Sequence, residues 1–273
     1  MPAVAASFPA SLVLAGAGKM GGAMLRGWLD AGLDPATLAV IDPNAGADLA
    51  SLAAERGFSL NGAAAAPEVL VLAIKPQALD EATALAALAT PQTLVISILA
   101  GKSIADVKKR LPGAGAIVRA MPNLPASVGR GMTGLKAGAG LTETQKKATE
   151  ALIGATGGFE WVEDERLIDA VTAISGSGPA YVFYLAECLA KAGEALGLSP
   201  PVAARLARAT VEGAGELLFQ SADKTPAQLR ESVTSPGGTT AAALEVLMAA
   251  DGLEPLARRA AEAARRRAQA LSG

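Results

Sequence analysis

The sequence contains no histidine and very few aromatic side chains. Its 273 residues include 2 Trp, 2 Tyr and 5 Phe, whereas 51% of the residues are hydrophobic. Without histidine, a Ser-His-Asp or Cys-His centre, a histidine general acid and a histidine-ligated zinc are all excluded. Proton chemistry must therefore use carboxylates, Lys, Tyr, hydroxyl groups, water or the substrate. The core must consist of Ala, Leu, Val and Ile, in one large domain or two of ordinary size.

Cysteine and net charge exclude further classes of function. The single cysteine, Cys188, rules out an internal disulfide and a cysteine metal cage, and we expect no metal site. Because Cys188 lies in an apolar helical run, we interpret it as a small core residue. The 24 Lys and Arg nearly balance the 26 Asp and Glu, so no global basic field would attract nucleic acid or an acidic membrane.

Two apolar segments have features of a secretory signal or a membrane span. No Lys or Arg precedes Lys19, so the apolar N-terminus lacks the basic start of a secretory signal. Residues 82–101 are uncharged and long enough to span a membrane, but Pro91 and Gln92 interrupt them. The first half of this stretch favours a helix and the second half a strand. We therefore expect a soluble, cytoplasmic protein without a membrane segment.

The first part of the chain alternates short apolar runs with helical patterns. These runs are apolar throughout, as expected for parallel strands that are buried on both faces. Their alternation with helices predicts a doubly wound parallel α/β sheet with right-handed crossovers. The expected strands are 12–15, 38–41, 69–74, 94–98 and 116–120, and the expected helices are 20–31, 45–56, 77–89 and 104–111.

The second part of the chain carries helical patterns only. We therefore expect two domains, 1–165 and 166–273. Helices that are apolar on more than one face, such as the one containing 181–186, must be buried on several sides. A region this short offers little internal core, so we expect it to form a homodimer. The expected helices are 165–174, 179–196, 200–220, 226–233, 239–248 and 253–271.

Three glycines form the densest motif of the first part. Gly16, Gly18 and Gly21 directly follow an apolar strand and precede an amphipathic helix. In such a unit the first glycine permits a tight turn, the second lets backbone approach a pyrophosphate, and the third lets helix and strand pack closely. The helix start offers free N–H groups and a partial positive charge to the phosphates. The motif predicts dinucleotide binding.

Asp42 follows the second expected strand. An acidic residue there hydrogen-bonds the 2′-hydroxyl of an adenosine ribose and repels a 2′-phosphate, which favours NADH over NADPH. Residues 42–44 also fit a turn with a helix cap, and the two interpretations are compatible. Lys75 lies at the edge of the expected nucleotide crevice, where it either neutralises a phosphate or lies on the surface.

Two glycine-containing turns precede apolar helices in the second part. They are Ser175-Gly176-Ser177-Gly178-Pro179 and Ser235-Pro236-Gly237-Gly238-Thr239-Thr240. Each exposes a helix N-terminus flanked by hydroxyl groups, which favours an anion. Ordinary turns with Ser or Thr caps would have the same composition. Two such turns in a helical half attached to a dinucleotide domain predict a small pocket for a carboxylate.

Several blocks of the sequence resemble pyrroline-5-carboxylate reductases. They occur in the family's order and are residues 16–21, 73–77, 97–101, 119–125, 169–181 and 235–240. The last two blocks are the most specific. The resemblance implies reduction of 1-pyrroline-5-carboxylate to L-proline by NADH or NADPH, the last step of proline biosynthesis. It also implies an N-terminal Rossmann domain and an all-α C-terminal domain that forms dimers, commonly arranged in larger rings.

The resemblance also assigns residues by their position in these blocks. Many family members carry a small hydroxyl or another residue suited to NADPH where this chain has Asp42, so NADH use is more expected here. The cofactor contacts would be Gly16, Ala17, Gly18, Lys19, Met20, Gly21, Asp42, Asn44, Asn61, Ala73, Ile74, Lys75, Pro76 and Ala100. The substrate contacts would be Glu165, Ser177, Gly178, Gly237, Gly238, Thr239 and Thr240.

The missing histidine agrees with this chemistry. A C=N bond accepts hydride chiefly when it is protonated, and such an iminium brings its own proton. The enzyme then needs mainly positioning and electrostatics. We expect the hydroxyls of Thr239 and Thr240 to fix the substrate together with the Gly237 and Gly238 amides, with a hydroxyl near the substrate nitrogen. The alternatives are a β-hydroxyacid dehydrogenase and a non-catalytic dinucleotide-binding module.

Overall fold

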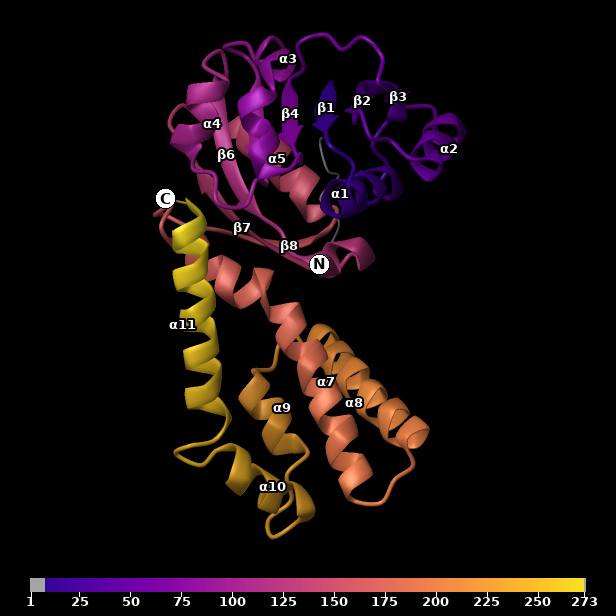
Figure 1. Cartoon of the computed structure of the whole chain (residues 1–273), viewed down its shortest axis with the longest axis vertical. Helices are drawn as coiled ribbons and strands as arrows, with labels where there is room; N and C mark the ends of the chain where they lie inside the picture. Colours follow the sequence, from indigo (N-terminus) through magenta and orange to yellow (C-terminus); the bar gives the residue numbers. More distant parts are fainter. Residues whose placement is uncertain (1–7, 273) are drawn as a thin grey trace. The chain divides into compact units, whose positions relative to one another are not determined.

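The structure is a computed structural model that describes residues 8–272 of the chain. Most of the apolar N-terminus that was assessed as a signal therefore lies outside the described residues. The chain forms two compact units (Figure 1). The first contains the chain up to Gly176 and the last part of the C-terminal helix, and the second spans residues 177–263.

An eight-stranded sheet organises the first unit, with the strand order β3-β2-β1-β4-β5-β6-β7-β8. All neighbouring pairs are parallel except β6 and β7. The predicted Rossmann-like parallel sheet is thus confirmed, and β3, β7 and β8 extend it. The strands are β1 (Leu12–Ala15), β2 (Leu38–Ile41), β3 (Ser59–Leu60), β4 (Val69–Leu72), β5 (Leu94–Ser97), β6 (Ala116–Met121), β7 (Gly131–Ala137) and β8 (Gly157–Trp161).

Most predicted helices of this unit form, but the continuous helix predicted at 77–89 is wrong. The structure has a 3-10 segment there and then one short α-helical turn. Ala82, with ψ 41°, leaves the helical conformation between them, and only Leu79 and Leu85 of the two segments are buried. The elements are α1 (Lys19–Asp30), η1 (Pro35–Thr37), α2 (Ala47–Arg56), η2 (Pro76–Glu81), α3 (Thr83–Ala86), α4 (Ile104–Arg110), η3 (Leu124–Val128), α5 (Glu143–Gly154), α6 (Leu167–Val171) and the π-helical η4 (Thr172–Gly176).

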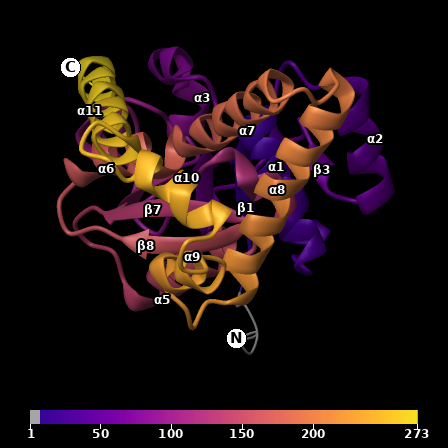
Figure 2. The same cartoon turned by 90° about the horizontal axis from the view of Figure 1, so that it is seen from below.

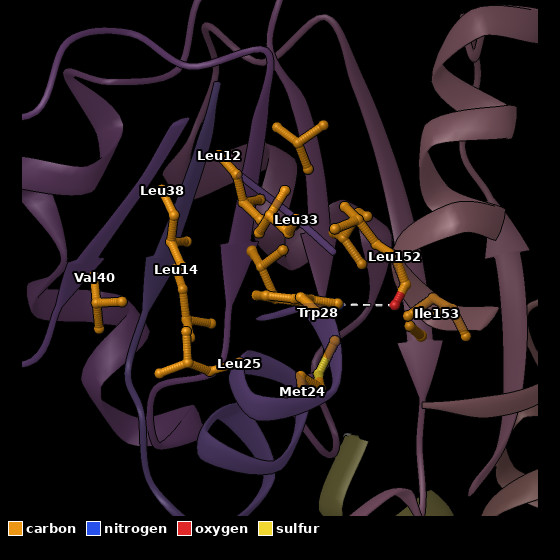
Figure 3. Packing of buried hydrophobic residues seen from close by; sticks show 14 of the residues in the cluster. Leu12, Leu14, Met24, Leu25, Trp28, Leu33, Leu38, Val40, Leu152 and Ile153 are labelled. Atoms are coloured by element: carbon orange, nitrogen blue, oxygen red, sulfur yellow. Dashed lines mark hydrogen bonds between the residues drawn. The ribbon is translucent and has the colours of Figure 1, made fainter. Parts of the chain in front are cut away.

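The core of the first unit lies on both faces of the sheet. Alternate residues of β1 show this division, because Leu12 and Leu14 belong to one buried cluster and Val13 and Ala15 to the other. Trp28 of α1 is fully buried in the first cluster, and its indole N–H donates to the carbonyl of Leu152 at 2.7 Å (Figure 3). This bond joins the last turn of α1 to α5 and holds α1 against the core.

The second unit lacks a comparable core. Its elements are α7 (Gly178–Ala195), α8 (Pro200–Gln220), α9 (Pro226–Ser232), α10 (Thr239–Leu247) and the first part of α11 (Leu253–Ser272). Figure 1 and Figure 2 both show α7 beside α8, where small residues allow a close approach. An added Cβ on Gly193 of α7 would lie 3.2 Å from the Cβ of Ala203 on α8.

Large apolar side chains of this unit are exposed in the single chain. Phe183 and Tyr184 are 58% and 61% exposed, and the buried residues described in this unit are Ala203 and Ala207 alone. Cys188 is exposed as well, so its interpretation as a core residue is wrong for the single chain. Across residues 8–272, every helix is too short or too polar to traverse a lipid bilayer.

Candidate functional site

The ends of four neighbouring strands form one row at an edge of the sheet. The register places Ile41, Ala15, Leu72 and Ser97 side by side. The residues that follow them, including Asp42, Gly16 and Ala73, therefore leave the sheet together. The chain proceeds from β1 to β2 on one side and later to β4 on the other, so this edge contains a topological switch point. Doubly wound folds bind their ligands at such points.

The glycine turn after β1 is shaped by close contacts on one side and open space on the other. Gly16 has φ +90°, and an added Cβ would lie 2.7 Å from the carbonyl oxygen of Ala73. An added Cβ on Gly21 would lie 2.2 Å from the carbonyl oxygen of Gly16. At Gly18 an added Cβ would meet no atom within 4 Å. No side chain caps the start of α1 at Gly18, so its first N–H groups face this open space.

Asp42 is fixed against this turn by hydrogen bonds. Its carboxylate accepts from the backbone N–H of Ala17 at 2.8 Å and from that of Asn44 at 2.9 Å. The side chain of Asn61 accepts from the N–H of Asp42 and donates to its carbonyl, both at 2.8 Å. Asn61 itself has a positive φ of 54°. The structure thus brings Asp42, Asn44 and Asn61 together at the glycine turn, and Asp42 also makes the predicted turn. The predicted helix cap at 42–44 is wrong, because α2 begins after Gly46 without a side-chain cap.

The other predicted cofactor residues lie at the same edge or on the first turn of α1. Lys19 and Ala100 are exposed, and Met20 and Ile74 are partly buried against the two core clusters. Lys75 is exposed at the start of η2, whose first residue is Pro76. Its side chain is therefore available either to a phosphate or to solvent, the two options that the sequence left open.

Glu165 belongs to a network of charged groups in the first unit. One of its carboxylate oxygens, Oε1, accepts from the backbone N–H of Ile104 at 2.8 Å and from Nη1 of Arg119 at 3.1 Å. The Arg119 side chain is only 9% exposed, and its Nη2 lies 3.9 Å from Oδ1 of Asp169. The sequence interpretation included Glu165 and missed Arg119 and Asp169. A charged residue inside an otherwise apolar strand was the available signal, because buried charges require partners.

The groups around this network are also paired. Hydrogen bonds from the hydroxyl and the backbone N–H of Ser103 hold the pKa of Asp106 below its usual range at the start of α4. Arg166 pairs with Asp164 and holds the pKa of that carboxyl at about 2. Arg166 is therefore engaged by its own neighbour, whereas Glu165 is paired with Arg119.

The remaining predicted substrate residues lie in the second unit, at two helix starts. Ser177 precedes α7, which begins at Gly178, and Gly238 precedes α10, which begins at Thr239. Neither start has a side-chain cap, so the ordinary-cap interpretation does not describe them. Gly237 has φ +68°, and Thr240 is partly buried. At the start of α7, Pro179 has no N–H and the Ala180 N–H donates to the Ser177 carbonyl at 3.0 Å. The Gly238 N–H likewise donates to the Ser235 carbonyl at 3.0 Å. The hydroxyls and the first N–H groups of α10 can receive an anion.

A cavity of about 350 Å³ lies elsewhere in the first unit. Its lining comes from β7, α5 and β8 and the segments beside them, and it contains no predicted site residue. The lining residues are Lys136, Ala137, Gly138, Gly140, Leu141, Lys146, Trp161 and Val162. The candidate site is therefore defined by strand ends and helix starts.

Family models match both parts of the chain. The model described as pyrroline-5-carboxylate reductase dimerisation matches residues 165–271, and the model described as NADP oxidoreductase coenzyme F420-dependent matches residues 11–101. The pyrroline-5-carboxylate reductase of Pseudomonas aeruginosa is 40% identical over 262 residues, which are 94% of this chain and 95% of that protein. The chain belongs to the pyrroline-5-carboxylate reductase family.

Solved structures of pyrroline-5-carboxylate reductases extend this likeness to the fold. The enzyme from Coxiella burnetii is 35% identical with a TM-score of 0.89, and the match covers 97% of this chain and 99% of that one. The enzyme from Plasmodium falciparum, solved with NADP bound, is 27% identical with a TM-score of 0.77, covering 96% and 98% of the two chains. The fold of this family member is thus shared over nearly its whole length.

Two glycine variants test the shape of the turn. Gly21→Ala should lower the free energy of unfolding by about 2 kcal/mol or more, because the new methyl meets the Gly16 carbonyl. Gly18→Ala should cost only about 1 kcal/mol, for a poorer helix cap, while weakening NADH affinity about tenfold by filling the open space. Urea unfolding and titration of NADH fluorescence measure the two effects. If Gly18→Ala bound NADH as tightly as the wild type, the pyrophosphate would not lie in the space beside Gly18.

Proposed function

We propose that this chain reduces the C=N bond of 1-pyrroline-5-carboxylate with NADH or NADPH to give L-proline, the last step of proline biosynthesis. Two features together carry the proposal. The glycine turn leaves open space beside Gly18, and the helix starts at Ser177 and Thr239 bear hydroxyls and have no side-chain cap. The chain belongs to the pyrroline-5-carboxylate reductase family, and this membership also supports imine reduction. Such a biosynthetic reaction suits the cytoplasm, where we place it.

The residues at the strand ends fit a nicotinamide dinucleotide. The space beside Gly18 is open, since an added Cβ would meet no atom within 4 Å, and the N–H groups at the start of α1 can donate to a pyrophosphate. When bound, the reduced nicotinamide supplies a hydride to the imine carbon. We assign its binding to Gly16, Ala17, Gly18, Lys19, Met20, Gly21, Asp42, Asn44, Asn61, Ala73, Ile74, Lys75, Pro76 and Ala100.

The helical domain would hold the substrate by charge and geometry. We take domain 166–273, together with Glu165, as the substrate part, with domain 1–165 binding the cofactor. The amide of Gly237 would receive the substrate carboxylate. The amide of Gly238 would do so by leaving the Ser235 carbonyl, to which it donates at 3.0 Å. The hydroxyls of Thr239 and Thr240 would orient the ring nitrogen. Ser177 and Gly178 would line the other side. The substrate enters as an iminium that already carries its proton, so no histidine is needed. The work of the enzyme is then orientation and electrostatic stabilisation.

We further propose that the chain acts as a homodimer formed through its helices, and that such dimers can assemble into a larger ring. The exposed apolar side chains of α7, such as Phe183 and Tyr184, support this proposal, as does the match to the dimerisation model. Burial of such side chains typically stabilises by about 1.5–3 kcal/mol each. A second copy of the chain would therefore cover the apolar side chains that the helical unit leaves exposed in the single chain.

The reaction and the role of Thr240 can be tested in one assay. Purified protein should oxidise NADH or NADPH only when 1-pyrroline-5-carboxylate is added, and proline should accumulate. Thr240→Ala should lower kcat/KM for the imine about tenfold or more and leave the dinucleotide Kd unchanged, because the hydroxyl is expected to contact only the substrate. Thr37→Ala is the matched control, because that hydroxyl donates to the Asp34 carbonyl, outside the proposed site.

Other outcomes of this assay identify the alternatives. Oxidation of a β-hydroxyacid with NAD, without activity on the imine, would indicate a β-hydroxyacid dehydrogenase. Binding of NADH without turnover of any substrate would indicate a binding module. An unchanged kcat/KM in Thr240→Ala would remove that hydroxyl from the mechanism.

Asp42 is proposed to favour NADH over NADPH. Its carboxylate is held beside the Ala17 amide, where it can accept from a ribose 2′-hydroxyl and repel a 2′-phosphate. Asp42→Ser should therefore lower the ratio of kcat/KM for NADH to that for NADPH by about tenfold or more. Steady-state kinetics with each cofactor measure the ratio, and Asp48→Ser, an exposed acidic residue on α2, is the control. An unchanged ratio in Asp42→Ser would contradict the assignment.

A further inference from the structure

One family-like block, around Arg119 and Asn123, has no role in the proposed reaction. We propose that Arg119 and Asn123 are positioning residues that hold the two ends of the segment 165–176, and so set the geometry for imine reduction without binding the dinucleotide. This inference rests on the proposed function. It follows from the contacts that these two buried side chains make with that segment.

Arg119 holds the start of the segment. It is the charged residue of β6, whose other residues are apolar, and its side chain is 9% exposed. A guanidinium in such surroundings is costly unless it is paired, and it reaches Glu165 at 3.1 Å and Asp169 at 3.9 Å. These two acids are four residues apart around the start of α6. One strand side chain therefore fixes both the entry to α6 and its first turn.

Glu165 links this point to a second element. The oxygen that contacts Arg119 also accepts from the N–H of Ile104, the first residue of α4. Loss of Arg119 would leave this carboxylate held by a single backbone N–H, and Glu165 would no longer be fixed relative to β6.

Asn123 holds the end of the segment. Its side chain is buried and uses both of its polar atoms: Nδ2 donates to the Ser175 carbonyl at 3.0 Å, and Oδ1 accepts from the Met132 N–H at 2.9 Å. Ser175 lies in the π-helical segment η4 (Thr172–Gly176), and such segments are often found at functional sites. An added Cβ on Gly176 would lie 3.1 Å from Cε of Met121, so the segment also packs against the end of β6.

The contacts of Arg119 and Asn123 matter for the reaction because of where the segment 165–176 lies in the chain. Residues 165–176 lead directly into Ser177 and Gly178, which we assign to the substrate. A displacement of about 1 Å in a reacting group can lower a rate about a hundredfold. The glycine turn and Asp42 make no contact with Arg119 or Asn123 among the described hydrogen bonds, so dinucleotide affinity should not depend on them.

A double-mutant cycle tests the proposal on the full-length protein. Arg119→Met and Glu165→Gln should each lower kcat/KM for 1-pyrroline-5-carboxylate about tenfold or more, with NADH Kd within about twofold of wild type. The double variant should be no worse than the poorer single variant, because both changes disrupt one contact. Arg119→Lys, which keeps the charge, should recover part of the loss. Asn123→Asp, which replaces the donor to the Ser175 carbonyl, should lower kcat/KM in the same way.

Arg110→Met is the matched control, because Arg110 forms an exposed ion pair with Asp80 and should retain wild-type kinetics. Circular dichroism verifies that each variant folds. If Arg119→Met does not fold, Arg119→Lys replaces it in the test. Additive losses in the double variant, a parallel loss of NADH affinity, or unchanged kinetics in Arg119→Lys and Asn123→Asp would each overturn the inference. Inactivity of the wild-type protein on the imine would overturn the proposed function and this inference together, whereas active, unaffected variants overturn the inference alone.

Discussion

The close approach of the β1–α1 turn to the end of β4 is the contact on which the rest of the site depends. Added carbons at Gly16 and Gly21 would collide with the carbonyl oxygens of Ala73 and Gly16. With no side chains between them, α1 starts directly over the ends of β1 and β4, and the Ala17 amide reaches the carboxylate of Asp42. The open space at Gly18 arises from the same geometry. The close packing of this turn therefore shapes the open space at Gly18 that we assign to the pyrophosphate.

The two units meet different physical demands. The sheet unit fills both faces with its own side chains and anchors α1 through the bond from Trp28 to the Leu152 carbonyl. The helical unit leaves large apolar side chains such as Phe183 uncovered in the single chain, and it belongs to a family with a dimerisation domain in this region. A protein without histidine can place an imine by helix starts and hydroxyls, since the substrate carries its own proton. Fold and composition therefore favour positioning over acid–base catalysis.

The sequence predicted what depends on local patterns and missed what depends on distant contacts. The five central strands and the glycine turn were predictable, because uninterrupted apolar runs and glycine spacing are local signals. The strands β7 and β8 were missed, since Gly134 lies inside the first and alternate residues of the second are exposed. Arg119 was missed as a site residue, although it is a charge in an otherwise apolar strand. Its partner Glu165 lies 46 residues away, so only the fold could identify the pair.

The transfer of hydride to the imine carbon is the central claim, and isotopic labelling tests it directly. The protein would be incubated in ordinary water with 1-pyrroline-5-carboxylate and reduced dinucleotide that carries deuterium at the transferring position of the nicotinamide, with each face labelled in turn. Mass spectrometry and NMR then locate the label. With one of the two labelled faces, proline should carry deuterium on C5, the ring carbon that is bonded to nitrogen and does not bear the carboxylate. Proline without deuterium from either face, or no proline at all, would contradict it.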